Sequence, residues 1–187
     1  SALMVLSSNQ VGYWRDSVSL FEQALRVTKD NHMAHNTLGL SLAHRGRTAE
    51  AIVQYEAALR IKPHYANAHN NLGLALMTQE KTDEAIGHYR KALDIVPRYP
   101  AAQINLGIAL TRKGEMAKAV SHFREALSIQ PNHAVALNNL GIAMARLGDA
   151  VSAIHHFRMA LEVQPNDAEI HNNLAITLAN SGQPREA

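Results

Sequence analysis

The sequence feature that most constrains the fold is a four-residue motif that returns every 34 residues. Its five copies are Asn36-Thr37-Leu38-Gly39, Asn70-Asn71-Leu72-Gly73, Ile104-Asn105-Leu106-Gly107, Asn138-Asn139-Leu140-Gly141 and Asn172-Asn173-Leu174-Ala175. A fixed period of this length is typical of stacked copies of one supersecondary unit. Such an array grows by adding units and needs no central core. The chain is therefore predicted to be a repeat array rather than one compact domain.

The period divides the chain into complete and partial units. Complete units are predicted at 32–65, 66–99, 100–133 and 134–167, and partial units at 1–31 and 168–187. Residues 1–31 are expected to supply mainly a second helix, and 168–187 a first helix without its partner. Because both flanks are incomplete, we expect the chain to be a fragment of a longer protein. Positions are numbered below as places within a unit, so that His32 stands at place 1.

Each unit is predicted to be two helices joined by a turn. Leu38 and Leu42 are spaced i and i+4, which puts them on one face of a first helix. Most copies then carry a glycine, namely Gly46, Gly114, Gly148 and Gly182. Glycine supplies the positive φ that a helix C-terminus favours. Glu80 occupies this place in one unit, where we expect a small cost unless the turn changes shape.

The second half of each unit has its own helical pattern. Tyr55, Ala58 and Leu59 are spaced i, i+3 and i+4, and the same spacing recurs in the later units. A proline then ends each second helix, at Pro63, Pro97, Pro131 and Pro165. The chain is thus predicted to be all-α.

A glycine inside each first helix needs a separate explanation. The residues are Gly39, Gly73, Gly107 and Gly141. Glycine inside a helix costs roughly 1 kcal/mol relative to alanine. We therefore predict that the paired helix approaches closely at this place, with its aromatic side chain against the glycine.

Composition excludes several classes of function. The formal net charge is only +2 and no basic run is present, so nucleic acid is not an expected partner. The absence of cysteine removes disulfides and thiolate chemistry, and leaves the compartment undecided. No stretch of about 18 apolar residues is present, so this chain is not expected to insert into a membrane.

No catalytic site or cofactor site is predicted. The sequence contains no nucleophile elbow, phosphate-binding loop or paired carboxylates. Histidines recur at one place in successive units, as at His88, His122 and His156, too far apart to share a metal ion, since packed helix axes lie roughly 8–10 Å apart. His32 and His35 could supply two ligands, but no third is evident. The chain is therefore not expected to be an enzyme, although it could be attached to one.

These motifs resemble the tetratricopeptide repeat. The match consists of Leu-Gly at places 7 and 8, a small residue at place 20, an aromatic at 24, Ala at 27 and Pro at 32. The tryptophan that the family carries at place 4 is replaced here by His35, His69, Gln103, Leu137 and His171. The resemblance implies an α-solenoid, a right-handed superhelix whose first helices line a concave groove. Family members use this groove to hold a peptide or a partner helix.

The resemblance also implies which residues face the groove. They are Asn36, Asn70, Asn71, Asn105, Asn138, Asn139, Asn172 and Asn173, the apolar Leu74, Ile108 and Ile142, and Arg112 and Arg146. Chaperone-binding members clamp a carboxylate with Lys and Arg, which are mostly missing at those places. The asparagines at place 6 are instead similar to the ladder in the array of O-linked N-acetylglucosamine transferase, which holds extended substrate backbone.

The place-6 asparagines allow two interpretations. A carboxamide complements a peptide group without charge, so a row of them can hold a ligand backbone. Alternatively, they bond to neighbouring helices and position the units. Four such bonds give only roughly 2–6 kcal/mol, at a net 0.5–1.5 each, against an association cost of about 4–15 kcal/mol. The apolar residues of the groove would have to supply the rest.

The leading hypothesis is a module that binds a protein or an extended peptide. One alternative is the substrate-recruiting or regulatory part of a glycosyltransferase, soluble or membrane-embedded. The stretch Tyr13-Trp14-Arg15-Asp16-Ser17 is similar to a junction in membrane glycosyltransferase-like proteins with such tails. The other alternative is a self-assembly scaffold, since an uncapped C-terminal helix predicts end-to-end contact between copies.

Overall fold

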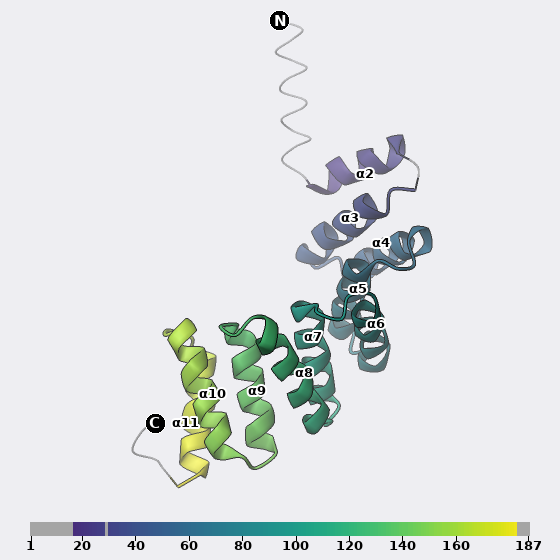
Figure 1. Cartoon of the computed structure of the whole chain (residues 1–187). Helices are drawn as coiled ribbons and strands as arrows, with labels where there is room; N and C mark the ends of the chain where they lie inside the picture. Colours follow the sequence, from purple (N-terminus) through teal and green to yellow (C-terminus); the bar gives the residue numbers. More distant parts are fainter. Residues whose placement is uncertain (1–16, 29, 183–187) are drawn as a thin grey trace, which may run out of the picture. The chain divides into compact units, whose positions relative to one another are not determined.

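The structure is a computed structural model that describes residues 17–28 and 30–182. In that part of the chain every regular element is a helix (Figure 1). The helices are α2 (Ser17–Val27), α3 (His32–His44), α4 (Thr48–Ile61), α5 (Ala66–Thr78), α6 (Thr82–Ile95), α7 (Pro100–Arg112), α8 (Met116–Ile129), α9 (Ala134–Arg146), α10 (Ala150–Val163) and α11 (Ala168–Asn180). The predicted all-α solenoid class is confirmed. No helix of the described residues is long and apolar enough to cross a membrane.

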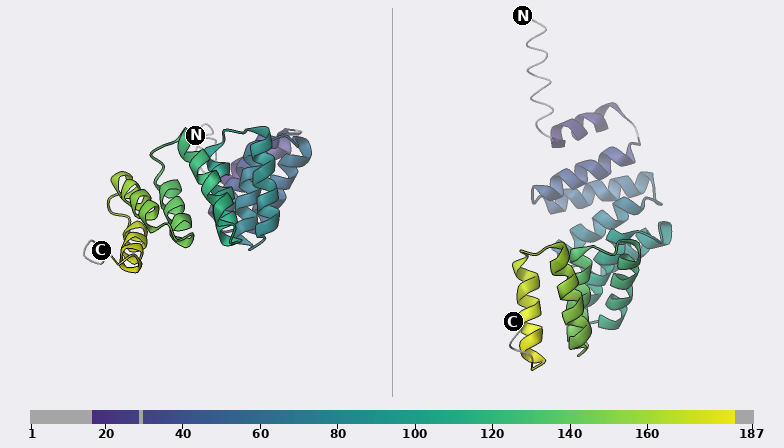
Figure 2. Two further views of the ribbon diagram at one scale, coloured as in Figure 1. Left: turned by 60° about the horizontal axis from the view of Figure 1, so that its bottom comes forward. Right: turned by 60° about the vertical axis from the view of Figure 1, so that its left-hand side comes forward.

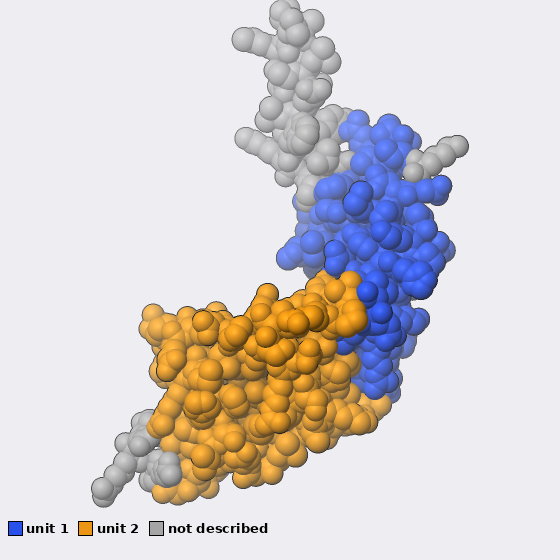
Figure 3. Space-filling model, in the orientation of Figure 1, with its two compact units in different colours: residues 1–95 blue, residues 96–187 orange. Residues whose placement is uncertain are grey.

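The chain forms two compact units, Ser1–Ile95 and Val96–Ala187, coloured separately in Figure 3. In the first unit, each helix from α2 to α6 packs against the next, and α3 also contacts α5. The same pattern holds from α7 to α11 in the second unit, where α9 also contacts α7 and α11 (Figure 2). Alternate helices thus bring equivalent places of successive repeats together within each unit.

The mid-helix glycines confirm the predicted close approach. Tyr55, Tyr89, Phe123 and Phe157 are each at most 2% exposed and pack against the glycine of their own repeat. A Cβ built on Gly107 would lie 2.5 Å from Cε1 of Phe123, and one on Gly39 would lie 2.6 Å from Cε1 of Tyr55. Any larger residue would displace the ring, which explains why glycine recurs where alanine would favour the helix.

The turn after each first helix keeps one geometry. Gly46, Gly114, Gly148 and Gly182 have φ between 74° and 86°. Glu80 takes the same left-handed conformation, with φ of 61°. Its turn also matches the turn at Gly46, because the amides of Gln79 and Lys81 both donate to the carbonyl of Leu76, as those of Arg45 and Arg47 do to the carbonyl of Leu42. The turn therefore does not change shape, and Glu80 carries the backbone strain.

Candidate functional site

The first helices of the first unit are joined by an asparagine pair. Asn71 on α5 donates from Nδ2 to Oδ1 of Asn36 on α3, at 3.0 Å. The donor stands at place 6 and the acceptor at place 5 of the preceding repeat. We call this contact the inter-repeat brace. It shows that a place-6 asparagine can position two repeats, as one of the two interpretations predicted.

The same brace recurs in the second unit. Asn173 on α11 donates from Nδ2 to Oδ1 of Asn138 on α9, again at 3.0 Å. Asn138 in turn donates to a carboxylate oxygen of Glu169 at 3.3 Å. Because two copies of the brace have equal length in separate units, it is a property of the sequence pattern rather than of one local environment.

Asn139 behaves differently because its neighbour differs. Place 5 of the preceding repeat is Ile104, which offers no acceptor. Asn139 donates instead to the backbone carbonyl of Val135, one turn earlier in its own helix, at 2.8 Å. The side chain of Asn139 therefore lies on the surface of α9 and does not form the inter-repeat brace.

Burial separates the two asparagine places. Asn36, Asn70 and Asn138 at place 5 are only 9%, 6% and 6% exposed. The place-6 asparagines are half-buried, namely Asn71, Asn105, Asn139 and Asn173. Asn172 is exposed. The buried place-5 amides serve packing, whereas the place-6 amides keep one edge at the surface.

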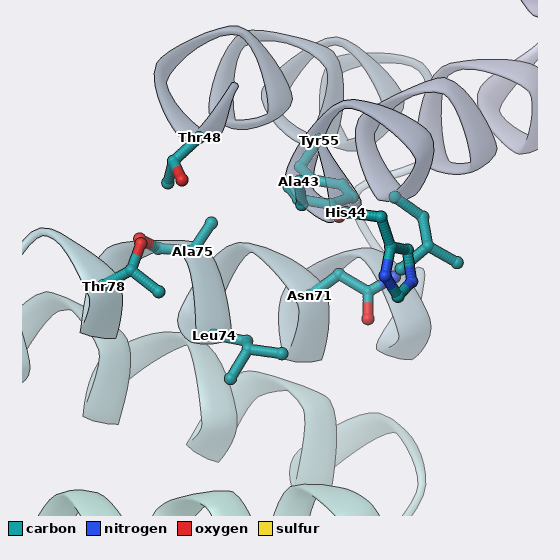
Figure 4. A pocket seen from close by; sticks show the side chains of 9 residues that line it. Ala43, His44, Thr48, Tyr55, Asn71, Leu74, Ala75 and Thr78 are labelled. Carbon is teal, nitrogen blue, oxygen red and sulfur yellow. The ribbon is translucent and has the colours of Figure 1, made fainter. Parts of the chain in front are cut away.

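An apolar cavity of about 280 Å³ lies beside Asn71 in the first unit. Figure 4 shows the side chains that line it, which come from α3, α4 and α5. Leu40 and Leu74 flank the cavity and are 41% and 50% exposed. No carboxylate and no Lys or Arg lines it. The lining thus combines a mostly apolar surface with the carboxamide of Asn71, the imidazole of His44 and the hydroxyls of Thr48 and Thr78. It has the chemistry to accept an uncharged side chain.

In the second unit, arginine side chains border the corresponding face of the first helices. Ile108 and Ile142 are half-buried on α7 and α9. Arg112 and Arg146 follow them by one turn, are exposed and end their helices. A cation at a helix C-terminus is favourable for the helix dipole alone. These arginines therefore have a structural reason to be present, independent of any ligand.

Three of the five place-4 side chains make a contact that was not predicted from the sequence. His35 pairs with Gln54, His69 with His88, and Gln103 with His122, at 2.8, 3.0 and 2.7 Å, and each partner stands at place 23 of the same repeat. The signal in the sequence is that both places are polar in these three repeats. Leu137 occupies place 4 of the next repeat and cannot form this contact. Among the described residues, no group of three or more metal-ligating side chains is present. Residues 13–16 of the junction-like stretch lie outside the described part of the chain.

Comparison with known proteins identifies the repeat. A tetratricopeptide repeat family model matches residues 64–132 and 98–166, and two further such models match 39–80 and 156–187. No curated protein matches significantly.

Solved structures show the same fold. YrrB, described as a tetratricopeptide repeat protein with an unusual peptide-binding site, has a TM-score of 0.74 at 21% identity, over 87% of this chain and 84% of its own. The pilF protein of Pseudomonas aeruginosa has a TM-score of 0.75 at 26% identity, over 83% and 72%. A chain of the Cut9-Hcn1 hetero-tetramer has a TM-score of 0.81 at 20% identity, over 86% of this chain and 32% of its own.

Proposed function

The chain belongs to the tetratricopeptide repeat family, and from this premise we propose that it binds an extended segment of a partner protein along its first helices. Proteins of this family are typically non-catalytic protein–protein interaction modules. Each unit has its own proposed binding face, which is Asn71 with Leu40 and Leu74 in the first unit, and Asn105, Asn139 and Asn173 with Ile108 and Ile142 in the second. The observation that carries the proposal is the half-buried amide of Asn71 beside an apolar cavity.

The brace prepares Asn71 for this role. Its Nδ2 has two hydrogens, and only one is needed for the bond to Asn36. One donor and the Oδ1 acceptor remain for a ligand, which matches the C=O and N–H of one peptide group. Because the brace fixes the orientation of the carboxamide, less conformational entropy is lost on binding. The two interpretations of the place-6 asparagines are therefore compatible.

Energies require an apolar contribution as well. A neutral hydrogen bond contributes a net ~0.5–1.5 kcal/mol, whereas burying one large aliphatic side chain contributes about 1.5–3 kcal/mol. The cavity beside Leu40 and Leu74 can accept such a side chain. The ligand we expect is thus an uncharged segment with an aliphatic residue, its backbone held by the amides.

Selection from a display library of random peptides against the full chain provides the probe. The selected peptide is then measured by fluorescence anisotropy with wild type, Leu74→Ala, which changes the cavity lining without removing the brace, and the control Asn132→Ala, which changes an exposed asparagine in a turn. Leu74→Ala should weaken binding roughly fivefold, the equivalent of about 1 kcal/mol. The control should bind as wild type does. Failure to select any peptide, or equal affinity for all three proteins, would refute the proposal.

The glycosyltransferase alternative also makes use of the paired asparagines at places 5 and 6, because a substrate-recruiting array would bind its substrate on the same face. The two readings differ in what is joined to the array, so the full-length reading frame discriminates them. A self-assembly scaffold predicts instead a molar mass that rises with concentration in analytical ultracentrifugation, without any peptide ligand.

A further inference from the structure

Place 4 and place 23 form a polar bridge on the side of the first helix that faces its partner. In the repeat 100–133, Gln103 donates from Nε2 to the carbonyl of Pro97 at 3.4 Å. Its Oε1 is paired with Nδ1 of His122 at 2.7 Å. The side chain at place 4 thus contacts two groups at once, namely the end of the preceding repeat and the second helix of its own repeat.

In the repeat 66–99 both places of this bridge are histidine. Nε2 of His69 lies 3.0 Å from the carbonyl oxygen of Pro63, and its Nδ1 lies 3.0 Å from Nδ1 of His88. A carbonyl only accepts, so Nε2 of His69 must carry a hydrogen. In a neutral ring, Nδ1 of His69 is then the acceptor. His88 must therefore donate its Nδ1–H, and the two neutral rings adopt opposite tautomers.

An added proton on Nδ1 of His69 would require His88 to move its own hydrogen from Nδ1 to Nε2, because two N–H donors cannot face each other at 3.0 Å. The positive charge would then lie on a ring that is only 7% exposed. A proton on Nε2 of His88 would instead add a charge to a half-buried ring near Lys91. Double protonation would bring two cations into contact. The neutral pair is the state that keeps both hydrogen bonds without burying a charge.

The surroundings also disfavour a positive charge. His69 is 7% exposed. The elements around it contribute Leu59 from α4, Pro63 and His64 from the α4–α5 connection, and Lys91 and Asp94 from α6. Asp94 is the only acid in this set. Burial lowers the pKa of both rings, and with the charges of His69 and Lys91 it lowers that of His88 to about 4.

We propose that the His69–His88 pair is an acid-sensitive latch, which holds α5 against α6 at neutral pH and loosens when the pair takes up a proton. The unfolded chain binds protons with a histidine pKa of about 6.5, above that of the folded pair. Stability from the latch is therefore complete above about pH 6.5 and is lost as the pH falls towards about 4. The latch is independent of the proposed peptide binding, because its test needs no ligand.

The other repeats supply the test variant. His88→Gln recreates the His35–Gln54 pairing of the repeat 32–65. A glutamine can turn its amide to offer either a donor or an acceptor, so it can follow the protonation of His69. His155→Gln removes an exposed histidine from α10 and serves as the control.

Urea denaturation of the three proteins at about pH 7 and about pH 5 measures the latch. The folding equilibrium constant of wild type should fall roughly tenfold more than that of His88→Gln, since one pKa unit corresponds to a factor of ten. His155→Gln should follow wild type. Parallel losses in wild type and His88→Gln would overturn the proposal.

Nitrogen-15 NMR of the imidazoles in wild type gives a second, independent readout that does not depend on the variant folding. It should show Nε2–H on His69 and Nδ1–H on His88, with His88 still neutral at about pH 5.5, one unit below the ordinary pKa of about 6.5. Equal tautomers in the two rings, or an ordinary histidine titration of His88, would also overturn the proposal.

Discussion

Gly107 should be intolerant of alanine, although alanine is the better helix former. A Cβ at this position would lie 2.5, 2.8 and 2.9 Å from three ring atoms of Phe123, which is itself 0% exposed. Replacement gains about 1 kcal/mol of helix propensity, while forcing extra volume into a packed core typically costs about 1–3 kcal/mol. Because the clash involves three atoms of a rigid ring, we expect Gly107→Ala to destabilise the protein by roughly 1–2 kcal/mol.

Gly87 on α6 is the matched control. Nothing lies within 4 Å of a Cβ built on it. Gly87→Ala should therefore stabilise the chain by about 0.5–1 kcal/mol, through propensity alone. Urea denaturation followed by far-ultraviolet circular dichroism measures both. In the double variant Gly107→Ala with Phe123→Leu, the two costs should be less than additive, because the smaller side chain makes room for the methyl group. A stabilising Gly107→Ala would refute the close-approach explanation.

Three further predictions concern a turn, a core and the brace. Glu80→Gly should stabilise the protein by roughly 1 kcal/mol because it relieves a left-handed backbone, while Gly114→Ala should destabilise it similarly; chemical denaturation checks both. Burial raises the pKa of Tyr55 to about 12, above the unfolded value of about 10. The stability that Tyr55 contributes is therefore present below about pH 10 and lost as the pH rises towards about 12. Tyr55→Phe should reduce this alkaline loss of stability in a series of denaturation measurements at increasing pH. Asn173→Ala removes a brace and should cost about 1 kcal/mol, whereas Asn139→Ala should change the unfolding free energy by less than about 0.5 kcal/mol; equal costs would contradict the distinction between them.

The fold could be predicted because several independent signals repeat in register. The aromatic at place 24 and the glycine at place 8 each carry a packing requirement, and both recur four times, so each copy confirms the others. Even Glu80, which breaks the turn pattern, follows the same backbone because the surrounding hydrogen bonds impose it.

The site could be predicted only in part, because an amide bonds equally well to a ligand or to a neighbouring helix. The residue at place 5 of the preceding repeat decides whether the amide can bond to a neighbouring helix. That residue is Asn36 for Asn71 but Ile104 for Asn139. These residues of successive repeats can be compared from the sequence alone. The burial of the place-5 side chains cannot be predicted in this way, because it depends on how closely successive first helices pack.

Site-specific photo-crosslinking shows whether a ligand lies along the first helices. A photoreactive phenylalanine analogue is placed at position 74 on α5 or at position 56 on α4, replacing Leu74 or Glu56, both of which are exposed. The peptide selected from the display library is then irradiated with each protein. We expect cross-linked peptide from position 74 and little from position 56. Cross-linking from position 56 alone would place the ligand on the second helices and contradict the proposal.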